Sequence, residues 1–479
     1  MSIQDRFKRI IFLTWKFGLA GGLVYLFLGF LTSRVSRDPL GFELPADGPR
    51  GAAVSFPPVS ADGFSASDFW RRFPEISPGA LSVHSGRSHD AEGSLEEVAA
   101  AASATGLDWV VLGDHPRDWA QEPGVFEPRR IGGVQLSLGA EMVIEESGRT
   151  LVIGLDSVPR AWSGRLAPMA DLAREAGGFT TIVHPRSPSY GESWKVPSVE
   201  GADAFEAFDV SEMARHRLAS IWMPYHLVSL IVGIPTRRMD ESLVRLWRER
   251  SNTPALLAYD SLRAVTQIGL TGGLNHHPKT RLRGKPFPGY EPFFRTVVNH
   301  LHLTEQLPGD PVAAQLVLSE AIRSGRMYVS IGWPQEADGF AFYGSAPVAE
   351  GTTELTEADP SSETDVQGSG ADATQPEDAD RLGGEESLMI LPGGVHQIAI
   401  GDRLIVELPR LRRAELLVRL LRDGRTVDWL PAQGASRLEW VITEPGVYRV
   451  EVNRGGLDFG PIRLGLTPWL FSNPIEFTR

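Results

Sequence analysis

The stretch GALSVHSGRSHDAEGSLEEVAAAASATGLDWVVLGDH, residues 79–115, contains an apolar run, a helical segment and a second apolar run. Ser94 and Glu97 have the spacing of a capping box, an alanine-rich body follows, and Gly106 suits the end of a helix. Each of the two apolar runs leads into a histidine. The stretch therefore predicts a strand, a crossover helix and a second strand parallel to the first.

The same alternation continues over residues 75–345. The short apolar runs, separated by helical stretches, are Gly79–His84, Trp109–His115, Val134–Glu141, Phe179–His184, Ala204–Phe208 and Ile268–Leu274. Strand and helix in alternation are typical of an α/β fold with a parallel sheet, and this length favours a closed, TIM-like barrel. We therefore expect an α/β barrel over residues 75–345.

Several predicted strands end in a side chain that can bind a metal ion. These side chains are His84, His115, Glu141, His184, Asn275 and His277, and Asp90 follows the first of them in the loop RSHDAEG. Because the carboxyl ends of parallel barrel strands share one rim, we expect these groups to converge. A single histidine after an apolar run is more often structural, so the prediction depends on the whole set. Imidazole and carboxylate ligands without thiolates suit Zn, Mn or Fe.

Two further candidates have weaker support. Glu206 ends the apolar run DAFEAF and either supports a ligand or is a plain carboxylate at the edge of the core. His300 and His302 form a His-x-His pair in FFRTVVNHLHL, where the flanking pattern indicates a helix. Residues two apart on a helix point in different directions, so we do not expect these two to share a metal ion.

Composition limits the classes of partner. The 479 residues include no cysteine, which excludes a disulfide scaffold and a thiolate metal site. Residues 349–386 hold twelve acidic residues and one basic residue, and so contribute −11 of the formal net charge of −13. The remaining 441 residues are close to neutral and show no basic track for a phosphate backbone. We therefore expect no binding to duplex nucleic acid.

The amino terminus has the pattern of a membrane anchor. Residues 10–32 are apolar apart from Lys16, whose long side chain can reach the headgroups. Basic residues in 1–9 predict a cytoplasmic tail, with the rest of the chain outside the cytoplasmic membrane after a single pass. A cleaved signal peptide is the alternative. Residues 33–74 are rich in Pro, Gly, Ser and Asp, which predicts a linker with one short helix around Asp68–Phe73.

The carboxyl-terminal part divides into two segments of different composition. Residues 346–388 are acidic, rich in Ser, Thr, Gly and Asp and almost without aromatic residues, which predicts a disordered linker. Within residues 389–479, ELLVRLLRDGRTVDWL predicts a hairpin that turns at Asp423-Gly424, and GVYRVEV alternates as a half-buried strand does. We therefore expect a small all-β sandwich here, whose protein partner the sequence does not identify.

The motifs VHSGRSHDAEGSLEE and GLDWVVLGDH resemble the first two motifs of the PHP domain, the polymerase and histidinol phosphatase family. GAE, TIVHPR and GGLNHH resemble three later motifs of that family, and all of them occur in order over residues 75–345. The ending GVYRVEV…PWLFSNPIEF is similar to the β-sandwich appended to envelope-type members of the family.

The resemblance implies a distorted seven-stranded β/α barrel that holds one to three divalent ions, Zn, Mn or Fe. By position, it implies that His84, Asp90, His115, Glu141, His184, Asn275 and His277 are metal ligands. It also implies that His277 is a ligand or a general acid, and that Asp114 is the partner of the second-motif histidine. His277 and Asp114 are thus the candidate catalytic residues.

The chain departs from the family pattern at three positions. Ser82 stands where the family has the first histidine of His-x-His, Asn275 stands where it has an aspartate, and Leu151 stands where it often has a metal-binding histidine. The resemblance therefore supports two hypotheses. The first is a membrane-anchored, extracytoplasmic phosphoesterase that hydrolyses a small phosphorylated substrate, nucleotides included. The second is a pseudoenzyme, in which the barrel remains as a binding or structural module.

Overall fold

The computed structural model describes residues 52–54, 67–144, 147–159, 162, 164–185, 194, 199, 201–210, 254–332, 336–347, 387–409, 415–433, 436–455, 458–459, 462–463 and 466–479. The predicted membrane segment, 10–32, and the acidic stretch 349–386 lie outside these residues. In the part of the chain that is described, no helix is both long enough and apolar enough to cross a bilayer.

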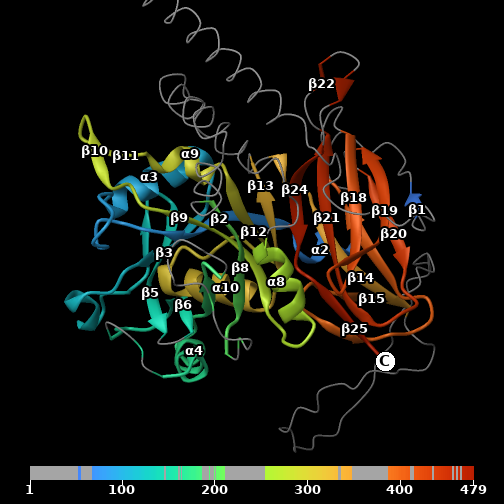
Figure 1. Cartoon of the computed structure of the whole chain (residues 1–479), viewed down its shortest axis with the longest axis horizontal. Helices are drawn as coiled ribbons and strands as arrows, with labels where there is room; N and C mark the ends of the chain where they lie inside the picture. Colours follow the sequence, from blue (N-terminus) through green and yellow to red (C-terminus); the bar gives the residue numbers. More distant parts are fainter. Residues whose placement is uncertain are drawn as a thin grey trace, which may run out of the picture.

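Seven strands close into a barrel, drawn from blue to green on the left of Figure 1. They follow the chain order, and the last pairs with the first: β2 Glu75–Val83, β3 Trp109–Asp114, β5 Val134–Ile144, β6 Gly148–Ile153, β7 Thr180–Val183, β8 Ala204–Asp209 and β9 Gly269–His276. Strand β6 runs antiparallel to both of its neighbours, whereas the other pairs are parallel. The interior and the surrounding layer are filled with apolar side chains, which supply the main stabilising term of such a core.

The expected closed barrel is confirmed, but a regular alternation of strand and helix around it is not. The segments between barrel strands include α3 Leu95–Thr105, the 3₁₀ turn η1 Asp118–Gln121, the short strand β4 Arg129–Ile131, α4 Leu166–Glu175 and α8 Pro254–Arg263. Strands β5 and β6 follow one another directly as an antiparallel hairpin, with Glu141 opposite Leu151. The sequence pattern did not reveal this reversal, because a buried strand has the same apolar signature in either direction.

Helix α3 has the expected capping. The Ser94 hydroxyl accepts a hydrogen bond from the Glu97 backbone N–H, and the Glu97 carboxylate accepts one from the Ser94 N–H. Gly106 ends the helix at a φ of 77°, a conformation that costs glycine little. The helix buries Val98 and four neighbouring small side chains, which holds the crossover from β2 to β3 in place where the first motif loop ends.

Two further strands extend the barrel sheet toward the carboxyl-terminal part of the chain. β12 Val297–Leu303 pairs with β2 and with β13 Met327–Ile331, which in turn pairs with β24 Leu466–Ser472. Nearby are β10 Thr280–Leu282, β11 Lys285–Phe287, α9 Tyr290–Phe294 and α10 Pro311–Arg323. His300 and His302 lie on β12, so the helix expected for this segment is wrong. The segment VVNHLHL is buried on both faces and has no periodicity that separates strand from helix.

Two sheets, at the right of Figure 1, are built mainly from the carboxyl-terminal part of the chain, with β1 and β14 added from earlier segments. One has the order β1 Ala52–Val54, β20 Arg437–Val441, β17 Arg403–Glu407, β14 Ala341–Pro347 and β15 Ser387–Ile390. The other continues the barrel sheet through β18 Glu415–Arg422, β19 Arg425–Gln433, β21 Gly446–Gly455, β25 Ile475–Thr478 and β16 Val395–Gln397, beside the small pair β22 Asp458–Phe459 and β23 Ile462–Arg463. Both sheets contribute side chains to one apolar core. The predicted hairpin turns at Asp423 and Gly424, which both have positive φ.

Short α2, Asp68–Arg72, agrees with the helix expected around 68–73 and packs Phe69 and Phe73 beside Tyr343 of β14. Asn473, in the carboxyl-terminal segment PWLFSNPIEF, has a structural role. Its side-chain oxygen accepts a hydrogen bond from Leu270 N–H at 2.6 Å, and its amide donates to the carbonyls of Leu270 and Met327 at 3.0 and 3.1 Å. The end of the chain is thereby fixed to barrel strand β9 and to β13.

Candidate metal centre

Four of the predicted ligands converge at the carboxyl ends of β2, β3 and β9. His84, Asp90, His115 and His277 each offer a ligand atom, and these atoms lie within 4.8 Å of one another. Asp90 Oδ2 is 3.4 Å from His277 Nε2 and 3.8 Å from His115 Nε2. The His84 and His277 rings stack with centroids 3.7 Å apart. The shared rim of the barrel thus brings together residues that are up to 193 positions apart in the sequence.

The loop of the first motif is held in place by its own hydroxyl groups. Ser88 Oγ donates to Asp90 Oδ1 at 2.9 Å and accepts from the His115 backbone N–H at 3.3 Å. On the opposite side, the Tyr290 hydroxyl donates to the His84 carbonyl at 2.8 Å. These contacts orient the Asp90 carboxylate toward the three imidazoles, which explains why a loop residue can act with residues at strand ends.

Asp114 is not in either group of candidate ligands among the described residues, and instead supports the loop that follows His84. Its carboxylate accepts hydrogen bonds from the Ser85 backbone N–H at 2.6 Å and from Ser85 Oγ at 2.7 Å. Burial raises the pKa of Asp114, although the nearby His84 charge and the two hydrogen bonds act in the opposite direction. Through Ser85, Asp114 fixes the backbone next to His84.

Glu141 lies between two groups of candidate ligands. Its Oε2 is 3.4 Å from His84 Nε2 and 3.4 Å from His184 Nε2, whereas its Oε1 is 2.6 Å from Arg149 NH1. Burial alone would raise the pKa of Glu141, but His184 and His84 hold it well below its usual range. Glu141 is therefore an ionised carboxylate that faces imidazoles on one oxygen and a guanidinium on the other.

A second, fully buried group consists of His184, Glu206 and Asp209. His184 Nδ1 is 2.6 Å from Asp209 Oδ2 and 4.0 Å from Glu206 Oε1. Burial, followed by the charge of Asp209, raises the pKa of Glu206 well above its usual value. The sequence left the role of Glu206 open, and it gave no reason to select Asp209. A bulge in the pairing of β8 between Glu206 and Phe208 lets both carboxylates reach the same group.

Two of the three positions at which the chain departs from the PHP pattern contact this second group. Ser82 Oγ donates to Glu206 Oε2 at 2.7 Å, and Asn275 Nδ2 lies 3.5 Å from Asp209 Oδ2 and 3.4 Å from His184 Nδ1. Ser82, His184 and Asn275 all have left-handed backbones, with φ of 57°, 51° and 45°. Strained backbone of this kind concentrates at functional sites, because the surrounding structure must hold it.

The donor set fits a divalent metal ion. Both ring nitrogens of His84, His277 Nε2 and Glu206 Oε1 are buried, and none of them has a hydrogen-bond partner among the described residues. Burial lowers the pKa of His115 to about 4 and that of His277 to about 2, with the neighbouring His84 adding to the second shift. These imidazoles are therefore neutral at pH 7, as metal ligation requires. Nitrogen and oxygen donors without sulfur suit Zn, Mn or Fe.

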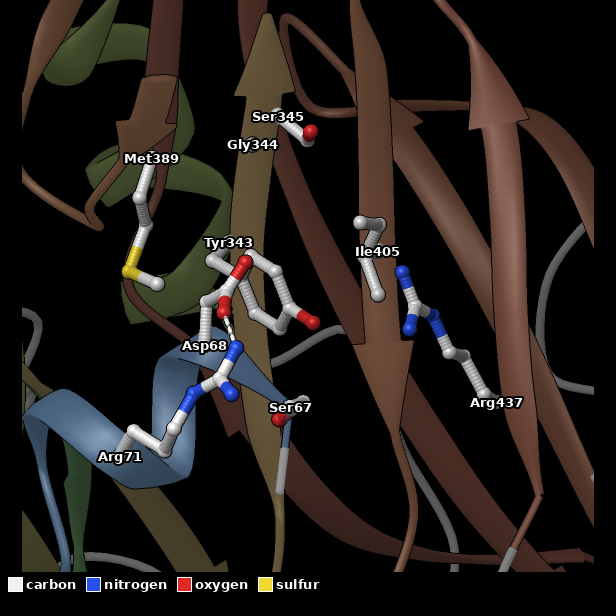
Figure 2. Close-up of a pocket in the computed structure, with 9 residues that line it drawn as sticks. All are labelled: Ser67, Asp68, Arg71, Tyr343, Gly344, Ser345, Met389, Ile405 and Arg437. Atoms are coloured by element: carbon white, nitrogen blue, oxygen red, sulfur yellow. Dashed lines mark hydrogen bonds and ion pairs between the residues drawn. The ribbon is translucent and has the colours of Figure 1, made fainter. Parts of the chain in front are cut away.

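A separate pocket opens beside α2 and shares no residue with the metal centre. It has a volume of about 210 Å³ and lies between α2 and strands β14, β15, β17 and β20. Figure 2 shows Arg71 paired with Asp68 on one side of this pocket, Tyr343 at its centre and Arg437 on the far side. Both arginines have carboxylate partners, Asp68 and Glu439, so the pocket offers little uncompensated charge to an anionic ligand.

Comparison with known proteins gives partial matches to solved structures. No protein-family model matches the chain, and no curated protein matches it. A novel lesion-specific endonuclease from Pyrococcus furiosus is similar at 14% identity and a TM-score of 0.30, over 53% of this chain and 56% of that one. Endonuclease Q in complex with a 27-mer duplex carrying an abasic lesion is similar at 13% identity and a TM-score of 0.30, over 52% and 56%. The chain thus spans about half the length of the structures that it matches.

These matches correct one expectation. Duplex nucleic acid was excluded as a partner on the basis of net charge, yet both of these solved proteins are endonucleases, and one of them holds a duplex substrate. Net charge is summed over a whole chain, whereas phosphate groups are bound by a few local cationic groups. A near-neutral chain is therefore no ground for excluding a duplex.

Proposed function

We propose that this protein is a metal-dependent phosphoesterase whose centre lies at the carboxyl-terminal rim of the barrel. The convergence of His84, Asp90, His115 and His277 within 4.8 Å carries this proposal. The buried Nε2 atoms of His84 and His277 support it, because each faces a carboxylate oxygen, of Glu141 and Asp90 respectively, at 3.4 Å, a separation typical of two ligands of one cation. The resemblance of the motifs to the PHP domain supplies the reaction class.

The residues of the centre have distinct roles in this proposal. His84, Asp90 and His277 supply ligand atoms, with His115 as the fourth candidate, and a divalent ion held there would supply Lewis acidity for the hydrolysis of a phosphate ester by water. A pKa of about 2 favours His277 as a ligand over His277 as a general acid, because a neutral imidazole lacks the acidic second proton that an imidazolium could give at pH 7. Asp114 acts through Ser85 and holds the backbone that carries His84.

The proposal also includes a substrate class and a location for the protein. The PHP resemblance favours a small phosphorylated molecule, nucleotides included. The apolar segment 10–32 favours an anchor in the cytoplasmic membrane, with the barrel and the two carboxyl-terminal sheets on the extracytoplasmic side. Fractionation of cells that express the full-length chain tests the anchor. A chain that stays in the soluble fraction and begins near residue 34 contradicts it.

A second candidate function is a metal-binding pseudoenzyme. Ser82 and Asn275 favour it, because neutral side chains at these positions reduce both the charge and the number of ligands in the centre. Metal binding and turnover separate the two hypotheses, since the pseudoenzyme retains the first without the second.

The test combines metal content with a hydrolysis screen of the full-length protein. The protein is loaded with Mn²⁺ or Zn²⁺, its bound metal is measured by elemental analysis, and it is offered phosphomonoesters, phosphodiesters, nucleotides and duplex DNA. Asp90→Asn should lower metal affinity at least about 10-fold and abolish turnover. Glu92→Gln in the same loop is the matched control, because Glu92 is exposed and is not in the ligand group. A parent protein that binds no metal and hydrolyses none of these substrates contradicts the proposal.

A further inference from the structure

Arg149 places a fixed positive charge inside the candidate centre. It lies near the start of β6, the antiparallel strand of the barrel, and its side chain is only 17% exposed. Its NH1 is 2.6 Å from Glu141 Oε1 and 3.3 Å from His115 Nδ1. Nothing in the segment RTLVIGL indicates that its arginine reaches the ligands, so this contact could not be predicted from the sequence.

One guanidinium nitrogen thereby contacts two atoms that could themselves bind a metal ion. Glu141 Oε1 and His115 Nδ1 are 3.9 Å apart, and NH1 lies close to both. Two ligands of a tetrahedral ion with bonds of about 2.1 Å are about 3.4 Å apart. The observed separation is slightly wider, as expected when a hydrogen-bond donor fills the position instead of an ion.

The contact with His115 also determines which ring nitrogen carries the proton. A guanidinium only donates hydrogen bonds, so His115 Nδ1 must accept, and the proton of the neutral ring then lies on Nε2, on the side of Asp90. His115 is therefore available as a ligand only when Arg149 leaves this position, and His84, Asp90 and His277 are the ligands while it stays. Both Glu141 Oε1 and His115 Nδ1 are occupied for as long as Arg149 holds this position. Release of Arg149 frees both of them together.

The neighbouring residues explain why a cation is needed at this point. Glu141 is 3% exposed, and an ionised carboxylate at that depth needs a compensating charge. Leu151, which lies opposite Glu141 in the strand pair, is apolar and offers no ligand for a metal ion. Arg149, two residues earlier and on the same face of β6, supplies the charge instead.

We propose that the Arg149 guanidinium is a built-in cation of this centre, which takes the position between Glu141 and His115 that a divalent ion would otherwise occupy. This inference rests on the proposed metal function. It states in addition that the centre binds one ion fewer than its carboxylates and imidazoles could hold. Because arginine stays protonated throughout the physiological pH range, this cation is permanent and cannot be removed by a chelator.

The test is the number of ions bound by the full-length protein and by Arg149 variants. Arg149→His offers an additional imidazole, Arg149→Ala frees the two atoms without replacing them, and Arg149→Lys is the matched control that keeps the charge. Equilibrium dialysis against Mn²⁺ should show one additional ion per chain for Arg149→His and Arg149→Ala, and no additional ion for Arg149→Lys. Thermal melting identifies which variants are folded, and any folded variant that opens the position is sufficient for the test.

The outcomes separate this inference from the proposed function. If the parent binds metal and neither folded Arg149→His nor folded Arg149→Ala binds a further ion, the inference is wrong while the phosphoesterase proposal stands. If the parent binds no metal but Arg149→His binds one ion, the inference is supported and the proposed function fails. If Arg149→Lys gains an ion as the alanine variant does, charge at this position does not exclude metal and the inference is overturned.

Discussion

The Nδ1 atom of His184 lies 2.6 Å from Oδ2 of Asp209, and both side chains are buried. The contact turns His184 Nε2 toward Glu141 Oε2, 3.4 Å away. Burial alone would lower the pKa of His184, but the charges of Glu141 and Asp209 hold it well above its usual value. Without metal, His184 therefore carries a proton on both ring nitrogens. Because Asp209 holds the Nδ1 proton, Nε2 is the atom that would give up its proton to a metal ion.

We therefore expect Asp209→Asn to weaken metal binding without removing a ligand. An amide orients the ring less firmly and lowers its basicity, and losses of about 10–100-fold in affinity are typical of such changes. Titration with Mn²⁺ measures the loss. Asp428→Asn is the control, since Asp428 is buried in the carboxyl-terminal sheets, where it accepts a hydrogen bond from Trp440. Equal affinities of Asp209→Asn and the parent would show that His184 takes no part in binding.

Asn275→Asp should have opposite effects on the metal-free and the metal-bound protein. The new carboxylate lies near Asp209, from which Asn275 Nδ2 is 3.5 Å away, so repulsion between buried acids lowers the melting temperature when metal is removed. Added Mn²⁺ should then raise the melting temperature more than it does in the parent, because an ion neutralises the added charge. Melting curves with EDTA and with Mn²⁺ measure both effects, and an unchanged metal-induced shift contradicts the expectation.

Much of the candidate centre could be predicted from the sequence, because most of its ligands end apolar runs and Asp90 follows one of them in a short loop. His84 and His115 directly follow β2 and β3, and Glu141 lies toward the end of β5; the carboxyl ends of these parallel strands meet at one rim. Asp209 could not be found in this way. On a regular strand Glu206 and Asp209 would point to opposite faces, and only the bulge of β8 brings them together.

Two further features could not be predicted from the sequence: how far a long side chain reaches, and the direction of a strand. Arg149 reaches Glu141 from a neighbouring strand, and that register follows from the β5–β6 hairpin, which the apolar pattern does not reveal. The helix expected over β12 was inferred from the flanking pattern, and the strand itself is buried on both faces and shows no alternation that would identify it. Pairing between strands, rather than local pattern, determines all of these features.

A buried charge network joins α8 to the carboxyl-terminal sheets, and its loss should destabilise the protein. Arg449 donates two hydrogen bonds of 2.7 Å to the carboxylate oxygens of Asp260 and one of 2.6 Å to Glu451, which is also paired with Arg419. Arg449→Met removes one partner and leaves two acids with less compensation, which should lower the free energy of unfolding by about 3–5 kcal/mol.

Chemical denaturation of Arg449→Met measures this loss, and Arg403→Met is its matched control. Arg403 pairs with Glu439 at 3.0 Å, but its side chain is 54% exposed, so that pair should contribute less than about 1 kcal/mol. A loss of similar size in both variants would show that burial of the Arg449 network adds nothing to stability.

Asn473→Ala should loosen the attachment of the chain end to the barrel. The substitution removes the partners of the buried Leu270 N–H and carbonyl and one partner of the Met327 carbonyl, which should lower the free energy of unfolding by about 2 kcal/mol or more. Hydrogen exchange at the Leu270 amide should accelerate, because that N–H loses its acceptor. Gln267→Ala, which removes an exposed hydrogen bond to the Gly393 carbonyl, is the control and should change stability by less than about 1 kcal/mol. If the Leu270 amide exchanges equally slowly in Asn473→Ala and in the parent, Asn473 does not hold the carboxyl-terminal motif on β9.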